Sequence, residues 1–183
     1  SDDARRLRGF SFLSAKPVLV VLNLDEANVA DPAGAIARAG ISELLSGAAT
    51  EAVPVCAKIE LEIAELAADD RAVFLADLGL PDSGLGPGIR ASHHLLGYIS
   101  FFTTGKDECR AWSVPRGTSA QDAAGQIHSD IARGFIRAEV VHYNALTARN
   151  GSLAACREHG EVRLEGKDYE VQDGDVINFR FAT

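Results

Sequence analysis

The sequence predicts an α/β part with parallel strands over residues 1–97, followed by an α+β part over residues 98–183. Two continuous apolar runs, each leading into a segment of helical periodicity, predict the first part. Short alternating segments with one amphipathic helix among them predict the second part. A content of 46% hydrophobic and 24% charged residues in 183 is ordinary for a folded protein of one large or two small domains.

The first part begins with the end of an expected helix over residues 7–13, followed by a strand over residues 16–23. That strand is a continuous apolar run, and such runs are typical of parallel strands that are buried on both faces. Asp31-Pro32 is a common helix start, with Asp as the N-cap and Pro in the first turn. It predicts one helix that reaches Leu45.

The alternation of strand and helix continues to the end of the first part. The further expected elements are a strand over residues 51–56 and helices over 58–67, 69–78 and 89–96. The Gly-rich stretch 83–88 is expected to be a linker turn, because Ile89 and Arg90 stand where a phosphate-binding loop requires Lys and Ser or Thr. Strands that alternate with helices predict a parallel sheet with right-handed crossovers, and the domain boundary is expected near Gly97.

Short segments with strand-like alternation dominate the second part. The expected strands cover residues 109–114, 135–142, 161–164, 169–171 and 176–181. One helix is expected from Thr118 through Ile131, because an N-cap residue precedes an acidic first turn and Gly134 follows the last apolar position. Strands wrapped around a single helix make an α+β fold of the β-grasp, ubiquitin-like type.

Composition argues against several classes of protein. The longest apolar run, residues 18–22, is far shorter than the roughly 20 residues of a membrane helix, so no membrane partner is expected. Three widely spaced cysteines without a C-x-x-C motif argue against a disulfide framework or a zinc site and favour a reducing cytoplasm. The first residues lack the apolar core of a signal peptide, and the absence of Met fits a piece of a longer protein.

The net charge of −8 argues against attraction to a nucleic-acid backbone by overall charge. We therefore expect no DNA partner, and any RNA contact requires a local basic face. Four arginines around the first predicted strand and the helix of the second part form the candidate contact with RNA or another partner: Arg110, Arg116, Arg133 and Arg137. The competing interpretation is a solvated surface with ion pairs to Asp122, Asp130 and Glu139. Trp112 is a candidate for stacking on a base or for the core.

Polar residues follow both apolar strands of the first part. Asn23-Leu-Asp-Glu26 ends the first strand, and Cys56-Ala-Lys58 ends the second. Ligands of open α/β sheets bind at the carboxyl ends of the strands, so the two loops should be neighbours. An Asn amide offers a donor and an acceptor, which suits the edge of a purine. The alternative is that Asn23 caps a strand end, Glu26 is a solvated acid and Lys58 opens a helix.

No catalytic residue and no metal site are expected in this chain. His93 and His94 are adjacent, and adjacent residues of a helix point about 100° apart, so they do not chelate one ion together. The other histidines have no suitably spaced partner. No nucleophile-elbow motif brings Ser, His and Asp together.

Several segments together resemble the C-terminal part of the YchF/Obg-like P-loop ATPases. In the second part they are residues 110–118, 123–130, 133–140 and 164–176, and in the first part residues 12–18, 23–26 and 54–60. The resemblance covers nearly the entire chain. It implies that residues 1–97 are the C-terminal portion of a P-loop nucleotide-binding domain and that residues 98–183 are a TGS domain of the β-grasp type.

In that family an Asn-x-x-Glu loop replaces the Asn-Lys-x-Asp loop of ordinary GTPases, and loss of the Asp that binds guanine relaxes the preference toward ATP. The resemblance implies a base-binding site made of Asn23, Leu24, Glu26, Cys56, Ala57 and Lys58. The family's activity with ATP and Mg²⁺ also needs a Gly-rich phosphate-binding loop, which this sequence lacks. No cofactor is therefore expected to bind tightly to this chain.

These observations give three hypotheses of function. The first is the C-terminal part of an ATP-preferring NTPase that works with the ribosome or RNA, in which this chain alone is not catalytic. The second is a non-enzymatic TGS module that binds or regulates RNA or protein. The third is an intramolecular regulator of a nucleotide site outside this chain. The sequence predicts no particular oligomeric state.

Overall fold

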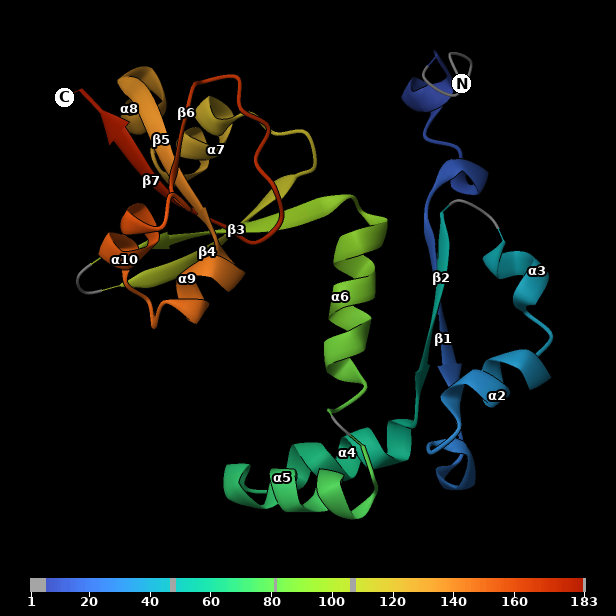
Figure 1. The fold of residues 1–183 in the computed structure, drawn as a ribbon. Helices are drawn as coiled ribbons and strands as arrows, with labels where there is room; N and C mark the ends of the chain where they lie inside the picture. The colour runs from blue at the N-terminus through green and yellow to red at the C-terminus, as the bar shows by residue number, and fades with distance from the viewer. Residues whose placement is uncertain (1–5, 47–48, 81, 106–107, 183) are drawn as a thin grey trace. The chain divides into compact units, whose positions relative to one another are not determined.

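The computed structural model describes residues 6–46, 49–80, 82–105 and 108–182 (Figure 1). The chain separates into two compact units, Ser1–Leu96 and Gly97–Thr183. The division between the two units falls between Leu96 and Gly97. Each unit has its own sheet and its own buried cluster of apolar side chains.

A two-stranded parallel sheet organises the N-terminal unit. β1 (Val18–Asn23) and β2 (Thr50–Val55) pair in parallel without a shift, from Val18 opposite Thr50 to Asn23 opposite Val55. The parallel pairing predicted for this part is confirmed. The predicted burial on both faces is wrong, because no residue of β1 is buried and Val21 is 61% exposed.

The predicted helix over residues 31–45 is two short helices, α2 (Pro32–Arg38) and α3 (Ser42–Leu45). Asp31 caps α2 as predicted, since its side chain accepts a hydrogen bond from the Gly34 amide. Gly40, with a φ of +66°, interrupts the helical path, and a left-handed residue of this kind ends a helix. The expected single helix was therefore wrong at Gly40.

Three further helices complete the N-terminal unit: α4 (Ala57–Glu65), α5 (Ala68–Asp77) and α6 (Leu85–Leu95). The linker turn predicted for residues 83–88 is wrong from Leu85 onward, because these residues form the first turn of α6. Pro87 is tolerated there because the first amides of a helix have no intrahelical partner. Arg6 and Leu7 are helical, and residues 8–10 and 13–15 are short 3-10 turns, η1 and η2, so the expected helix end holds only at Leu7. A further 3-10 turn, η3 (Glu26–Asn28), follows β1.

A mixed five-stranded sheet in the order β4-β3-β7-β5-β6 forms the centre of the C-terminal unit. The strands are β3 (Tyr98–Thr104), β4 (Cys109–Pro115), β5 (Phe135–His142), β6 (Arg163–Glu165) and β7 (Asp175–Phe181). β3 lies parallel to β7, and the other neighbours are antiparallel. β3 is a strand that the sequence pattern did not indicate. Phe101 and Phe102 hide its alternation, because each packs into a different buried cluster.

Helices cover both faces of this sheet (Figure 1). α7 (Ala120–Ile127) packs through three fully buried alanines on the cluster that contains Ala138 and Val140, and α8 (Ser129–Arg133) follows it. α9 (Tyr143–Ala148) and α10 (Leu153–Glu158) contribute to a second cluster, which contains Val141. Adjacent strand residues point to opposite faces, so the two clusters lie on opposite sides of the sheet.

The single helix expected from Thr118 to Ile131 is divided at His128. This residue has an extended backbone, with φ −162° and ψ 142°, and its Nδ1 accepts a hydrogen bond from the Asp130 amide. His128 thereby ends α7 and caps α8. A local side-chain bond of this kind competes with continuation of the helix.

The strand predicted at residues 169–171 is also wrong. Its backbone groups instead hold the segment before α7: Ala120 donates to the Tyr169 carbonyl at 2.8 Å, and Val171 donates to the Thr118 carbonyl at 3.0 Å. Only one isolated bridge, Ser119 with Glu170, is formed here. The segment therefore ties the start of α7 to the sheet.

A buried carboxylate secures this tie. Asp175 is 1% exposed and accepts hydrogen bonds from the Tyr169 hydroxyl at 2.7 Å and the Gln172 amide at 2.9 Å. Arg163 donates to the same hydroxyl at 2.9 Å. Burial, together with the hydrogen bond to Asp175, raises the pKa of Tyr169 to about 12. The hydroxyl is therefore a constant donor to the carboxylate.

Tyr169→Phe should lower the free energy of unfolding of the C-terminal unit by about 1.5–3 kcal/mol, because the buried carboxylate of Asp175 loses the hydrogen bond that the Tyr169 hydroxyl donates. The single tryptophan, Trp112, lies in this unit, so its fluorescence during urea unfolding measures the effect. Tyr143→Phe is the matched control, because Tyr143 is 50% exposed. Equal stability of the two variants would contradict this role of Tyr169.

Candidate functional site

The carboxyl ends of β1 and β2 meet at one edge of the N-terminal sheet. Asn23 Oδ1 accepts a hydrogen bond from the Ala57 amide at 3.0 Å, across 34 residues of sequence. The Leu24 amide donates to the Val55 carbonyl at 2.8 Å. The predicted adjacency of the two loops is therefore confirmed. Because Ala57 is bound to Oδ1, the Asn23 amide group is oriented with its oxygen toward α4.

An ion pair closes the same edge. Lys58 Nζ lies 2.6 Å from Glu26 Oε1, and both side chains are more than half exposed. The hydrogen bond to Glu26, followed by the charge of that carboxylate, raises the pKa of Lys58. Exposed pairs of this kind add little to stability, so the consequence is for charge: the Glu26 carboxylate is already matched by a cation.

Cys56 differs from the other predicted base-binding residues. It is 4% exposed and packs with Ile59 and Ile63 in the cluster beneath α4. The structure thus brings Asn23, Leu24, Glu26, Ala57 and Lys58 together at the edge, whereas the Cys56 side chain anchors the start of α4. A buried Cys of this kind behaves as a small apolar residue.

The four predicted contact arginines do not form one cluster. Arg110 lies on β4 and Arg137 on β5, which β3 and β7 separate in the sheet. Arg133 ends α8 and pairs with Asp130 at 3.3 Å, as the competing interpretation proposed for that acid. Arg116 follows β4, where its amide donates to the Gly97 carbonyl at 2.7 Å.

Trp112 packs against the main cluster of the C-terminal unit and is partly buried. Its ring stacks on Phe101 with centroids 6.4 Å apart, and the Arg110 guanidinium lies 4.4 Å from its centroid. The indole nitrogen donates to the Thr103 hydroxyl at 3.0 Å. The Trp112 ring thus already contacts Phe101 and Arg110, which favours the packing role over base stacking.

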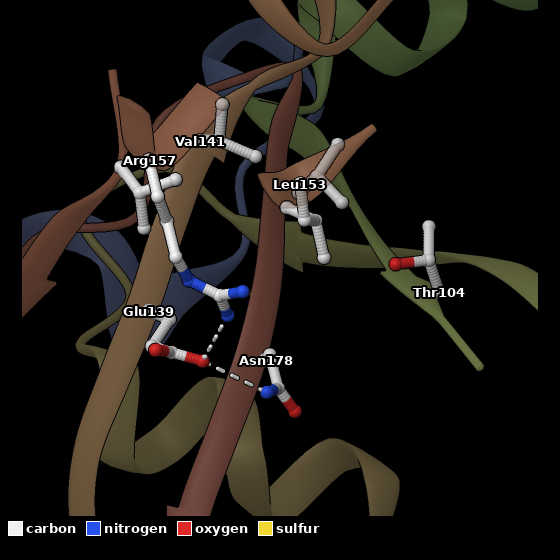
Figure 2. Close-up of a pocket in the computed structure, with 8 residues that line it drawn as sticks. Thr104, Glu139, Val141, Leu153, Arg157 and Asn178 are labelled. Atoms are coloured by element: carbon white, nitrogen blue, oxygen red, sulfur yellow. Dashed lines mark hydrogen bonds and ion pairs between the residues drawn. The ribbon is translucent and has the colours of Figure 1, made fainter. Parts of the chain in front are cut away.

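A second charged cluster surrounds Glu139 on β5 (Figure 2). This carboxylate is 7% exposed and accepts hydrogen bonds from Arg180 at 2.6 Å, Asn178 at 3.0 Å and Arg157 at 3.3 Å. Burial by itself would raise the pKa of Glu139, but the hydrogen bonds from Arg180 and Asn178 and the two positive charges hold it below its ordinary value.

The sequence analysis considered Glu139 only as a partner for the four arginines. The structure pairs it with Arg157 and Arg180, neither of which had been singled out. The available signal was a glutamate between the apolar residues Ala138 and Val140, near the middle of a predicted strand. Such a buried acid requires basic partners, although alternation alone does not say which.

Within the described residues, no group of three or more His, Cys, Asp or Glu side chains is arranged to hold a metal ion. In the same part of the chain, every helix is too short or too polar to cross a membrane.

Comparison with known proteins identifies the family. The family model YchF-GTPase_C, described as a protein of unknown function, matches residues 98–182. The ribosome-binding ATPase YchF of Bacillus subtilis is 49% identical over 180 residues, which are 98% of this chain and 49% of that protein. The chain belongs to the YchF family. The ribosome-binding ATPase YchF of Pasteurella multocida is 43% identical, again over 98% of this chain and 48% of its own length.

A solved structure supports the same assignment. The YchF GTPase of Schizosaccharomyces pombe matches 96% of this chain and 46% of its own chain, with a TM-score of 0.81 and 26% identity. The chain thus spans about half the length of the curated YchF relatives it matches. It corresponds to the C-terminal part of YchF-family proteins.

Asn23→Ala should make the Ala57 amide exchange its hydrogen about fivefold to tenfold faster, because one hydrogen bond worth about 1 kcal/mol is lost. Asn23→Asp keeps an oxygen acceptor at the same position and should preserve the protection. Amide hydrogen exchange followed by NMR measures both variants. Unchanged protection in Asn23→Ala would show that the bond does not join the two loops.

Proposed function

We propose that this chain is the C-terminal part of an ATP-preferring, YchF-like NTPase that acts with the ribosome in the cytoplasm. The observation that carries the proposal is the edge at which Asn23 is bound to Ala57 and Glu26 to Lys58. In this proposal residues 1–97 supply the base-facing side of a nucleotide site. Residues 98–183 are a TGS domain that makes contact with ribosomal RNA or another partner.

The chemistry of this edge favours adenine. Adenine presents an N7 acceptor and an N6 amino donor on one edge. With its oxygen bound to Ala57, Asn23 has its amide NH₂ left to donate to N7 of either purine, so the discrimination rests on Glu26. A guanine would need a carboxylate for its N1 and N2 hydrogens, and Lys58 already neutralises Glu26. Leu24 and Ala57 would border the base, and Cys56 would support the loop from beneath.

The phosphates and Mg²⁺ of a bound ATP would be held outside this chain. The sequence contains no Gly-x-x-x-x-Gly-Lys-Ser/Thr loop, and phosphoryl transfer depends almost entirely on positioning and neutralising the phosphates. The names of the relatives differ in the nucleotide, ATPase for the bacterial proteins and GTPase for the Schizosaccharomyces pombe protein. The ion pair of Glu26 is the reason that we favour ATP here.

Sheet order supports the TGS, β-grasp assignment of the second unit. β3 and β7 lie parallel at the centre, antiparallel strands flank them, and α7 packs across one face. The two buried clusters of this unit lie within residues 97–183. That self-contained core favours a second candidate function, a non-enzymatic module that binds or regulates RNA or protein.

Residues 1–183 should hydrolyse neither ATP nor GTP above background in the presence of Mg²⁺, because the groups that neutralise the phosphates are missing. Release of inorganic phosphate measures this. Turnover that scales with the concentration of the chain and persists through further purification would contradict the proposed division of the site.

The purified chain should co-sediment with ribosomes, and its affinity should fall as salt is raised if arginines bind phosphates. Sedimentation across a salt series gives the slope of log affinity against log salt concentration. A slope near zero would indicate a protein contact. Absence of co-sedimentation at low salt would contradict a ribosome contact through this part of the protein.

A further inference from the structure

We propose that Arg137, Arg157 and Arg180 form an anion-binding surface on the sheet face opposite α7, and that its partner is the phosphate backbone of ribosomal RNA. Glu139 is the buried anchor that positions two of the three guanidinium groups. This inference rests on the proposed ribosome contact. It replaces the four arginines chosen from the sequence with a set that the fold brings together, of which Arg137 alone is shared.

Alternation along β5 places these groups on one face. Ala138 and Val140 point into the cluster under α7, so Arg137 and Glu139 point to the other side of the sheet. On β7, Arg180 lies directly opposite Arg137, and directly paired residues share a face. Arg157 reaches the same place from α10 and donates to Glu139 (Figure 2).

Glu139 orders the arginines without cancelling their charge. Its side chain is buried, whereas those of Arg157 and Arg180 are 51% and 57% exposed. Glu139 pairs with Arg157 and Arg180, and the register of β5 with β7 places Arg137 on the same face, which leaves a local surplus of two positive charges. Arg149, which follows Arg137 as the next arginine in the sequence, is instead neutralised by Glu161, whose Oε1 lies 2.9 Å from its guanidinium. The exposed Glu158 follows Arg157 on α10. Adjacent helical residues point about 100° apart, so Glu158 does not lie on the same side of the helix as Arg157.

The direct pairing of Arg137 with Arg180 is the second observation that points to an anion. Like charges directly opposite each other on neighbouring strands lower stability. Glu139 offsets this repulsion only in part, because it also accepts from Arg157. Each guanidinium has five N–H donors, and Glu139 engages one nitrogen of Arg157 and one of Arg180. An external anion would satisfy further donors and reduce the repulsion.

The shape of the surface favours an extended polyanion. The hollow beside Glu139, lined by residues that include Thr104, Leu153 and Asn178, has a volume of about 10 Å³, which is room for roughly one water. A small organic ligand does not fit there. Arg157 lines this hollow, and its exposed guanidinium group, like that of Arg180, can bind a phosphate in a bidentate manner. Phosphates repeated along an RNA strand can meet three arginines at once.

The test compares two variants of the full 183-residue chain that lose the same net charge. The first carries Arg137→Ala, Arg157→Ala and Arg180→Ala together with Glu139→Gln, so that no buried carboxylate is left without partners. The matched control carries Arg110→Ala, Arg116→Ala and Arg133→Ala together with Asp130→Asn. Circular dichroism and thermal unfolding establish that both are folded.

Binding to ribosomes and to deproteinised ribosomal RNA is measured over a salt series. The first variant should lose at least about tenfold in affinity, and its log–log salt slope should become shallower by about 2 to 3, as three lost phosphate contacts require. The control should match the unsubstituted chain. Arg137→Ala alone, which leaves the Glu139 hydrogen bonds intact, should reduce the slope by about 1. It keeps the test valid if the larger variant fails to fold.

Three results would overturn the inference, and they are distinguishable. If the unsubstituted chain binds neither ribosomes nor RNA, the proposed ribosome contact fails with it. If the chain binds but only the control variant loses affinity, or neither variant does, the surface lies elsewhere while the proposed function stands. If loss of the arginines weakens binding to ribosomes but the unsubstituted chain does not bind deproteinised RNA, the partner is a ribosomal protein.

Discussion

The alternation of side chains along β5 and β7 is the constraint on which the C-terminal unit depends. Ala138, Val140 and Ile177 fill the cluster under α7, while Val141 and Val176 fill the cluster beside α9 and α10. Between two covered faces, a charged side chain that is buried must be neutralised within the fold. Glu139 is the buried charge on β5, and Arg157 and Arg180 neutralise it.

The N-terminal unit depends on a simpler constraint. Parallel pairing in register makes β1 and β2 end together, so the residues after them are neighbours although they are far apart in sequence. Asn23 then has the Ala57 amide within reach, and Glu26 has Lys58. The Glu26–Lys58 pair contributes little to stability because both side chains are more than half exposed, and its consequence is for the local charge at this edge.

Charge is distributed unevenly over a chain whose net charge is −8. Arg133 and Arg149 each have an acidic neighbour that neutralises them. Arg157 and Arg180 share a single carboxylate, and Arg137 lies opposite one of them. This face of the sheet therefore carries more arginines than carboxylates. In an acidic chain, a local surplus of this kind determines where a polyanion can approach.

The sequence by itself determined the two-part organisation, the parallel strands of the first part, the Asp31 cap and the family. These depend on periodicity and on contacts within a few residues, which local patterns record. Only the tertiary structure decided the sheet order, the strand β3 and the partners of Glu139. Phe101 and Phe102 are adjacent but serve opposite clusters, so β3 shows no clear alternation. Arg157 and Arg180 lie 18 and 41 residues from Glu139, and no local pattern selects partners at such separations.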